Sequence, residues 1–413
     1  MRVLIFTQYF WPENFHINAI ARNLHSVGVL VTVLTGKPNY PEGKIFEGYS
    51  QLGIQEDEYC GFEIIRVPMI QRGKNSAKGL LLNYLSFILS GYLFAPYSLR
   101  GKKFDAIFVY APSPLLQALP AIYMSWLKKA PLILWVQDIW PEALVSTGFV
   151  KSPLILKIVK LAVRYIYCFS DSILIQSEGF RKSVESLTKK IEKIHFFPNS
   201  AEVTGLNATM PEETVRLSAE IASHFSVVFA GNIGAAQSCE TIIDAAQLLS
   251  DRQKIKFYLI GTGSRVEQIK SYIRAKKLDN VVMTGRLSAE DMSSVFTSAS
   301  VLLLTLTNDL AVSSTIPSKL QSYLAAGKPI IASCDGEAAF LVEKAKAGLT
   351  CRASDAAELA DAVKTLSEMT SDERDSLGKN GSDYFKMNFC LQSRTAELIS
   401  HFSDTLELYK NSS

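Results

Sequence analysis

Short apolar runs recur along the chain, and most are separated from the next by an amphipathic stretch. This is the pattern of parallel strands whose sheet is covered on both faces by helices. In the first half of the chain it predicts strands at Val3–Phe6, Val31–Thr35, Ile107–Tyr110, Leu132–Val136 and Ile173–Ile175. In the second half it predicts strands at Val227–Ala230, Phe257–Ile260, Val281–Thr284, Val301–Leu306, Pro329–Ala332 and Gly348–Cys351. The chain is therefore expected to be α/β, with two Rossmann-like, doubly wound domains.

The length of 413 residues also fits two domains better than one. The polar stretch 200–213 has the composition of a linker, so we expect an N-terminal domain over 1–199 and a C-terminal domain over 200–384. The segment 385–413 is helical in character, and we expect it to cross back to the N-terminal domain. Two facing domains of this kind should enclose a deep interdomain cleft, which is a common place for a ligand.

Glycine and small polar residues stand at the carboxyl ends of strands in the second domain. One strand runs into Gly231 and Gly234, and two others end in Gly261-Thr262-Gly263 and in Gly285-Arg286. Glycine lets the backbone approach a ligand closely, and we expect a positive φ at Gly234. Open α/β sheets bind nucleotides at this edge, so a nucleotide site is predicted there. The chain has neither GxxxxGKS/T nor an opening GxGxxG, which argues against a P-loop NTPase and a redox dinucleotide site.

The segment 311–333 adds a helix to the same edge. A polar loop leads into a helix that opens at Pro317, Ser318 and Lys319 and ends at Gly327. Proline in the first turn and glycine just past the end are typical helix boundaries. The N-terminus of a helix beside a lysine suits a diphosphate. An ordinary βαβ crossover without a ligand is the alternative.

Acidic and polar residues follow two strands of the first domain. Asp138 and Glu142 come after the strand at 132–136, and Glu13, Asn14 and His16 come after the first strand. Asp138 could orient or deprotonate a substrate hydroxyl with support from Glu142, while Glu13, Asn14 and His16 could bind that substrate. The alternatives are a capping role for Asp138 and a structural role for His16 at the start of a helix.

Composition excludes several classes of protein. A net charge of +3 is too small for a global nucleic-acid footprint. The six cysteines show no CxxC or Cys/His spacing, so we expect reduced thiols in a cytoplasmic protein and no bound metal. The N-terminal residues pass from a strand directly into a turn, which is not the pattern of a signal peptide.

Two segments of the first domain point to a membrane surface. The run from Gly79 to Leu99 has no charged residue, and we expect a helix that lies in the interface with Leu85 and Phe87 toward lipid. Lys157, Lys160 and Arg164 share one face of the helix expected at 152–169 and could meet anionic lipid. A buried core helix and an ordinary solvated basic face are the alternatives.

The chain resembles the retaining glycosyltransferases of family 4 over essentially its whole length. The resemblance is carried by VLIFTQYFWPEN near the N-terminus, LWVQDIWPE at 134–142, FPNS at 197–200, FAGNIG at 229–234, LIGTG at 259–263 and PSKLQSYLAAGKP at 317–329. Within the family it is most similar to the bacterial branch that builds O-antigen, capsule or colanic-type polysaccharide, and there to the L-fucosamine and L-fucose transferases. The resemblance implies the GT-B architecture, with an acceptor-binding N-terminal domain and a donor-binding C-terminal domain. It also implies that the substrate met by Asp138, Glu142, Glu13, Asn14 and His16 is the acceptor.

The resemblance also implies a donor site. Its diphosphate part matches Gly231, Asn232, Ile233 and Gly234 with Pro317, Ser318 and Lys319, and its base and ribose part matches Gly261, Thr262, Gly263, Gly285 and Arg286. Three departures from the family pattern stand out. Ser314 and Ser322 replace a pair of glutamates that contact sugar and ribose, Asn232 and Gln237 replace an Arg and a Lys, and Gln137 replaces a His. The positive charge facing the diphosphate is therefore expected from Lys319, Arg286 and helix dipoles.

The expected protein is an enzyme that moves a sugar, such as N-acetyl-L-fucosamine or another deoxy or amino sugar, from UDP to a polyprenyl-diphosphate-linked glycan. Transfer would retain the anomeric configuration and use no metal or other cofactor. The enzyme would lie at the inner face of the cytoplasmic membrane. One alternative is a non-hydrolysing UDP-sugar epimerase, which turns over without an acceptor. The other is a non-catalytic nucleotide-sugar-binding protein.

Overall fold

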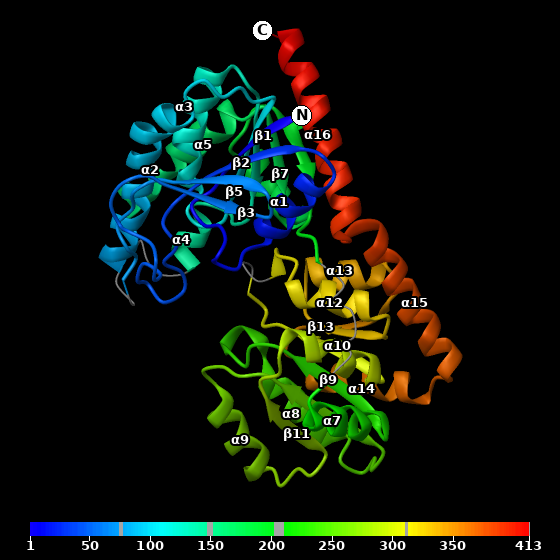
Figure 1. Ribbon diagram of the computed structural model, residues 1–413. Coiled ribbons are helices and arrows are strands. Elements are labelled where there is room, and N and C mark those ends of the chain that lie inside the picture. Colours follow the sequence, from blue (N-terminus) through cyan, green and yellow to red (C-terminus); the bar gives the residue numbers. More distant parts are fainter. Residues whose placement is uncertain (74–76, 147–151, 202–209, 310–312, 413) are drawn as a thin grey trace. The chain divides into compact units, whose positions relative to one another are not determined.

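The computed structural model describes residues 1–73, 77–146, 152–201, 210–309 and 313–412. Most of the predicted linker, at 202–209, and residues 310–312 before the donor-site helix lie outside the described residues. The chain divides into two compact units (Figure 1). The first unit comprises Met1–Asn199 and Leu391–Ser413, and the second comprises Ser200–Cys390. Each unit is a β-sheet with helices on both faces.

The first unit is built on an eight-stranded sheet with the order β3-β4-β2-β1-β5-β6-β7-β8. The strands are β1 Arg2–Phe6, β2 Leu30–Thr35, β3 Gln55–Tyr59, β4 Phe62–Arg66, β5 Ala106–Ala111, β6 Leu132–Val136, β7 Ser172–Ile175 and β8 Ile194–Phe196. All neighbours run parallel except β3, which pairs antiparallel with β4 at the edge. The five predicted strands are confirmed, whereas β3, β4 and β8 were not predicted.

Helices cover both faces of this sheet (Figure 1). On one face α1 (His16–Ser26) and α16 (Leu391–Ser412) share a core with the strands. On the other face lie α2 (Ala77–Ser98), α3 (Ala118–Lys128) and α5 (Pro153–Phe169). Two short helices, α4 (Glu142–Ser146) and α6 (Arg181–Glu185), belong to connecting segments.

The helix α2 has two different sides. Leu85 is half exposed, in line with the expectation for a helix at an interface. Phe87 is fully buried, and its ring centroid lies 5.8 Å from that of Phe6 on β1. The expectation that Phe87 faces lipid is therefore wrong. Two positions that are two residues apart point about 200° apart around a helix, so only one of them can face outward.

The second unit is built on a fully parallel six-stranded sheet with the order β11-β10-β9-β12-β13-β14. Its strands confirm all six predictions: β9 Phe225–Ala230, β10 Ile255–Ile260, β11 Val281–Gly285, β12 Val301–Thr305, β13 Ile330–Ser333 and β14 Gly348–Cys351. Its helices are α7 Glu212–Ala222, α8 Cys239–Leu248, α9 Val266–Ala275, α10 Ala289–Ser298, α12 Ser318–Ala326, α13 Glu337–Lys344, α14 Ala356–Glu368 and α15 Ser371–Asn388.

Each sheet has one point at which the strand order reverses. This point lies between β1 and β5 in the first unit and between β9 and β12 in the second. The connections after these strands diverge toward opposite faces and leave a crevice outside the carboxyl ends, where open α/β sheets bind ligands. The glycine loop after β9 and the segment that leads from β12 to α12 therefore meet at the switch point of the second sheet.

Candidate active site

The loops after β9, β10 and β11 are joined by backbone hydrogen bonds beyond the ends of the strands. The N–H of Gly231 donates to the carbonyl of Ile260 at 2.9 Å, and the N–H of Ile233 donates to that of Thr262 at 2.9 Å. The N–H of Gly261 donates to the carbonyl of Gly285 at 2.7 Å. The predicted donor-site residues 231–234, 261–263 and 285 thus lie along one continuous edge.

Two glycines are required by this close approach of loops. Gly261 has φ +150, and a Cβ added there would lie 1.8 Å from the carbonyl oxygen of Gly231. A Cβ at Gly263 would lie 2.3 Å from the carbonyl oxygen of Ile233. Gly234 differs, because its φ of −128 and ψ of −179 are extended values that any residue can adopt. The expectation of a positive φ at Gly234 is wrong. A Cβ there would meet the Asn232 amide nitrogen at 2.6 Å.

Lys319 stands beside the glycine loop, one residue inside α12. A Cβ at Gly231 would lie 3.2 Å from the Lys319 ammonium, which itself lies 4.3 Å from the ring centroid of Phe229. The ammonium donates to the side-chain oxygen of Gln237. No ion pair among the described residues neutralises it. Burial lowers the pKa of Lys319 to about 8. An anion bound beside the ammonium would therefore stabilise its charged form.

The placement of Lys319 follows from the ends of α12. Pro317 occupies the N-cap position, one residue before the predicted first turn, and Gly327 ends the helix with a left-handed φ of 66. The Tyr323 hydroxyl accepts from the N–H of Ala230 at 2.9 Å and thereby ties α12 to the end of β9. The positive end of the helix dipole consequently lies at the same edge as the glycine loop.

A pocket of about 580 Å³ adjoins this edge within the second unit. Its lining mixes residues of the joined loops with apolar and polar residues of the neighbouring helices: Ala230, Gly231, Asn232, Ile260, Gly261, Thr262, Arg286, Leu287, Met292, Ser293, Phe296, Ser322, Ala325 and Ala326. The predicted residues Asn232, Thr262, Arg286 and Ser322 are exposed here. Ser314 and Ser318 lie in the segment that leads into α12 and in its first turn, and they are outside this lining.

In the first unit, Asp138 follows β6 and meets a residue that follows β5. The Ser113 hydroxyl donates to the Asp138 carboxylate at 2.8 Å and accepts from the indole N–H of Trp140 at 3.1 Å. Ser113 stands next to the switch point of this sheet, and nothing in its local sequence pointed to it. Glu142 is the exposed first residue of α4. Tyr84 of α2 interacts electrostatically with Arg72 and Asp138.

Glu13 is buried and holds a neighbouring loop. Its carboxylate accepts from the N–H of Asn39 at 2.8 Å and from that of Tyr40 at 2.7 Å. Burial raises the pKa of Glu13 to about 7, although these hydrogen bonds act in the opposite direction. Asn14 is exposed, and His16 opens α1 with a pKa lowered by burial. Glu13 thus holds the loop of Asn39 and Tyr40 in place, and the next residue, Asn14, has an exposed polar side chain.

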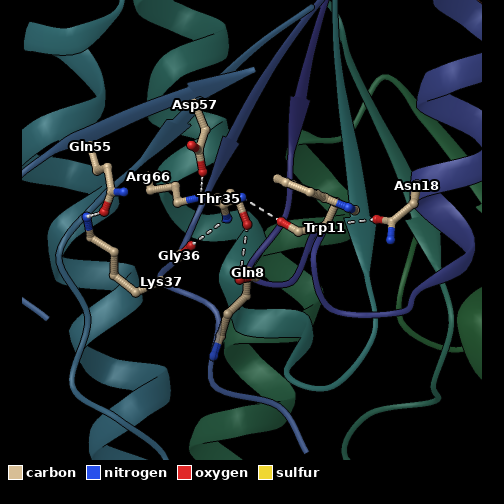
Figure 2. Close-up of polar contacts among 9 residues, drawn as sticks. All are labelled: Gln8, Trp11, Asn18, Thr35, Gly36, Lys37, Gln55, Asp57 and Arg66. Atoms are coloured by element: carbon tan, nitrogen blue, oxygen red, sulfur yellow. Dashed lines mark hydrogen bonds and ion pairs between the residues drawn. The ribbon is translucent and has the colours of Figure 1, made fainter. Parts of the chain in front are cut away.

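A buried arginine, which sequence patterns did not reveal, ties the same loops together (Figure 2). Arg66 ends β4, is fully buried, and pairs with Asp57 of β3 at 2.7 Å. Its other guanidinium nitrogens donate to the carbonyls of Trp11 and Gly36, in the loops after β1 and β2. Lys37, also buried, donates to Gln55 at 3.2 Å, and burial lowers its pKa to about 8. These residues fix the backbone that carries Glu13.

Within the described ranges, no group of three or more His, Cys, Asp or Glu side chains is arranged to hold a metal ion. The predicted site residues fall into two sets. The donor-side set lies along one edge of the second unit, and the acceptor-side set lies at the carboxyl edge of the first unit.

Comparison with known proteins bears on the family and the fold of the chain. Residues 224–369 match the family described as glycosyl transferases group 1. The chain is 24% identical over 347 residues to WbjE of Pseudomonas aeruginosa, a probable glycosyltransferase, with 79% of this chain and 82% of that protein covered. It is 24% identical over 338 residues to WcaI of Escherichia coli K12, a putative colanic acid biosynthesis glycosyl transferase, with 79% and 82% covered.

Among solved structures, Anabaena HepE in complex with UDP is similar to the chain with a TM-score of 0.69 at 15% identity. The similarity covers 98% of this chain and 100% of that one. The chain therefore has the GT-B fold, and its second unit carries a sequence match to the group 1 glycosyl transferases.

Proposed function

We propose that the protein transfers a sugar from a UDP-sugar, bound by the second unit, to a lipid-linked glycan, bound by the first unit. The observation that carries the donor half is Lys319, a cation beside the glycine loop whose pKa is lowered by burial. A lysine in this state binds a diphosphate more strongly than a solvated lysine does, because the anion replaces the hydration that burial removed.

The donor diphosphate would lie between the 231–234 loop and the start of α12, with the nucleoside in the adjoining pocket. UDP is favoured as the nucleotide because HepE, which shares the fold, is described in complex with UDP and with UDP-glucose. The reaction breaks the bond between the anomeric carbon and the diphosphate oxygen. Lys319 and the dipole of α12 stabilise the negative charge that develops on the diphosphate. No metal or other cofactor is part of the proposal.

On the acceptor side, Asp138 would take the proton of the attacking hydroxyl, and Ser113 would orient its carboxylate. The name of WcaI places that relative in colanic acid biosynthesis, which favours a growing surface polysaccharide as acceptor. From the family resemblance we propose a polyprenyl-diphosphate-linked glycan, retention at the anomeric carbon, and a deoxy or amino sugar such as N-acetyl-L-fucosamine. The enzyme would then work at the inner face of the cytoplasmic membrane.

Calorimetry with UDP tests the donor half. Lys319→Ala should weaken UDP binding about ten- to a hundredfold, since a hydrogen bond to a charged group contributes roughly 1.5–3 kcal/mol. Lys344→Ala is the matched control, because Lys344 also lies over a phenylalanine ring but is exposed on α13. Unchanged affinity in Lys319→Ala would remove Lys319 from the site, and tighter binding of GDP than UDP would overturn the nucleotide assignment.

Transfer of sugar to a lipid-linked acceptor tests the other half. Asp138→Asn should lower turnover about 10²- to 10⁴-fold while UDP affinity stays as in the wild type. A variant that keeps most of its turnover would show that Asp138 has only a structural role. Conversion of a UDP-sugar into its epimer without acceptor would instead support the epimerase alternative.

A further inference from the structure

Apolar side chains are exposed together on three helices of the first unit. On α2 they recur with helical spacing, and Leu89 is 60% exposed. Trp126 on α3 is 52% exposed and Ile158 on α5 is 57% exposed. We call this surface the three-helix face and define it by Leu85, Leu89, Leu93, Trp126, Ile158 and Leu161. In Figure 1, α2, α3 and α5 lie on the same side of the sheet.

Ring contacts show that the three helices form one continuous surface. The ring centroids of Tyr92 on α2 and Tyr123 on α3 are 5.8 Å apart. Those of Trp126 on α3 and Phe169 on α5 are 5.3 Å apart. Isolated exposed apolar residues need no explanation, but a contiguous patch across three helices marks an interaction surface.

The charges of the three-helix face are of one sign. None of α2, α3 and α5 contains Asp or Glu. Lys157, Lys160 and Arg164 are exposed on α5, between apolar positions such as Ile158 and Leu161. A protein partner would be expected to offer this surface acidic side chains at fixed places, whereas an anionic bilayer offers negative charge along a whole plane above an apolar interior. The interleaving of cations and apolar residues along α5 fits the bilayer.

Tyrosine and tryptophan are the aromatic residues that prefer the boundary between water and lipid, because an apolar ring carries one polar group. Exposed residues of this kind occur on each helix, with Tyr97 on α2, Trp126 on α3 and Tyr165 on α5. The aromatic composition of the face thus matches an interface more closely than it matches the interior of a bilayer.

The inner side of α2 keeps this helix in the fold. In the described part of the chain, α2 is the one helix long and apolar enough to cross a bilayer, judged by length and hydropathy. Yet Phe87 packs into the core, and the fully buried Asn83 donates to the carbonyl of Ile70 at 2.6 Å and accepts from Gln8 at 2.7 Å. A crossing helix would have to break these contacts and leave the sheet.

We propose that the three-helix face docks on an anionic lipid bilayer, with α2, α3 and α5 lying in the interface. The inference deepens the proposed function and rests on it in one respect, the membrane location of the acceptor. Docking would also place the bilayer close to the proposed acceptor site. The helix α2 presents Leu85 and Leu89 to lipid, while Tyr84 on the same helix interacts electrostatically with Asp138. An acceptor diphosphate at the bilayer surface would thus be near the loops that carry Asp138.

Sedimentation of the full chain with vesicles tests the proposal without donor or acceptor. The vesicles are pure phosphatidylcholine or an equimolar mixture with phosphatidylglycerol. The wild type should bind the mixed vesicles more strongly. Lys157→Glu with Lys160→Glu and Arg164→Glu should lower binding to mixed vesicles about a hundredfold or more, since each basic residue near an anionic surface contributes about fivefold. Leu85→Asp with Leu89→Asp and Trp126→Asp should lower binding to both kinds of vesicle.

Matched controls come from other exposed residues of the first unit. Leu52→Asp with Ile191→Asp, and Lys182→Glu with Lys189→Glu and Lys190→Glu, should bind vesicles as the wild type does. Far-UV circular dichroism and thermal unfolding should match the wild type for every variant, which shows that the first unit is folded. Calorimetry with UDP, which is assigned to the other unit, should give wild-type affinity for every variant. It also separates failure of docking from failure of the proposed function.

Two results would overturn the proposal. One is wild-type protein that stays in solution with mixed vesicles at low salt while it still binds UDP. The other is a wild-type protein that binds no vesicles and is a dimer by light scattering, while the variant Leu85→Asp with Leu89→Asp is a monomer. The face would then join two copies of this chain.

Discussion

The lowered pKa of Lys319 predicts that UDP binding is coupled to protonation of this side chain. Burial brings this pKa from the ordinary 10.5 to about 8 in the free protein. A diphosphate beside the ammonium favours its charged form and should return the pKa at least to the ordinary value. UDP binding should therefore be accompanied by proton uptake at any pH where free Lys319 is partly neutral.

The size of the expected proton uptake follows from the change of the Lys319 pKa between about 8 in the free protein and at least 10.5 beside the diphosphate. This difference corresponds to about 3 kcal/mol of preference for the charged form. At pH 8 about half of the free molecules carry a neutral Lys319, so about half a proton should be taken up for each UDP bound. At pH 6.5 the uptake by Lys319 itself should be close to zero, because the free side chain is already charged. Above pH 8 the affinity for UDP should fall up to about tenfold for each pH unit.

Titration calorimetry in two buffers with different enthalpies of ionisation measures this uptake, because the apparent enthalpy of binding then depends on the buffer. The phosphate groups of UDP do not interfere at pH 8, since their last ionisation lies near pH 6. Lys319→Arg is the control, because arginine stays charged throughout and should show no uptake. An enthalpy that is independent of buffer at pH 8 in the wild type, or equal uptake in Lys319→Arg, would refute the placement of the diphosphate at Lys319.

Two further predictions concern loops of the two units. Gly263→Ala should lower both the Tm and the UDP affinity, because its Cβ would stand 2.3 Å from the Ile233 carbonyl. Gly101→Asn is the control: it lies in the first unit, its Cβ meets open space and Asn tolerates its φ of +77, so both quantities should stay near the wild-type values. Equal effects of the two substitutions would contradict the joined-loop arrangement. Because burial raises the folded-state pKa of Glu13 to about 7, the folded state binds the proton more tightly than the unfolded state. Its contribution to stability is therefore present at low pH and lost as pH rises from about 4.5 to about 7, by about 3 kcal/mol, in the wild type but not in Glu13→Gln. Urea titrations of both proteins at the two pH values measure the difference, and parallel pH profiles would be the contrary result.

The strands of the second unit were predictable because most of them contain an apolar run in a sheet covered on both faces, as in VVFA of β9 and VLLL of β12. β3 was not predictable in this way. Its sequence, QEDEY, has the acidic composition of a loop, and it is extended because it pairs antiparallel with β4 and its Asp57 meets Arg66. Tertiary pairing overrides local preference at such an edge strand.

The two halves of the candidate site differ in the same way. The donor edge is marked locally, since glycines at strand ends and the start of α12 are visible in short segments of sequence. On the acceptor side the partners come from separate elements, such as Ser113 after β5 and Asp138 after β6, and only the fold brings them together. The side of α2 that faces outward was also hidden, because both of its sides are apolar and Phe87 and Leu89 look equivalent in the sequence.

The position of α16 in the first unit has a consequence for how the protein is made. Leu398 and Phe402 of this helix are buried in one core with Leu24 and Phe108. Those two residues leave the ribosome early, whereas α16 is translated only after the whole of the second unit. During that interval the part of the apolar sheet face that α16 covers is exposed. The first unit therefore completes its core after the unit that follows it in the chain. Exposed apolar surface of this kind is what chaperones of nascent chains bind.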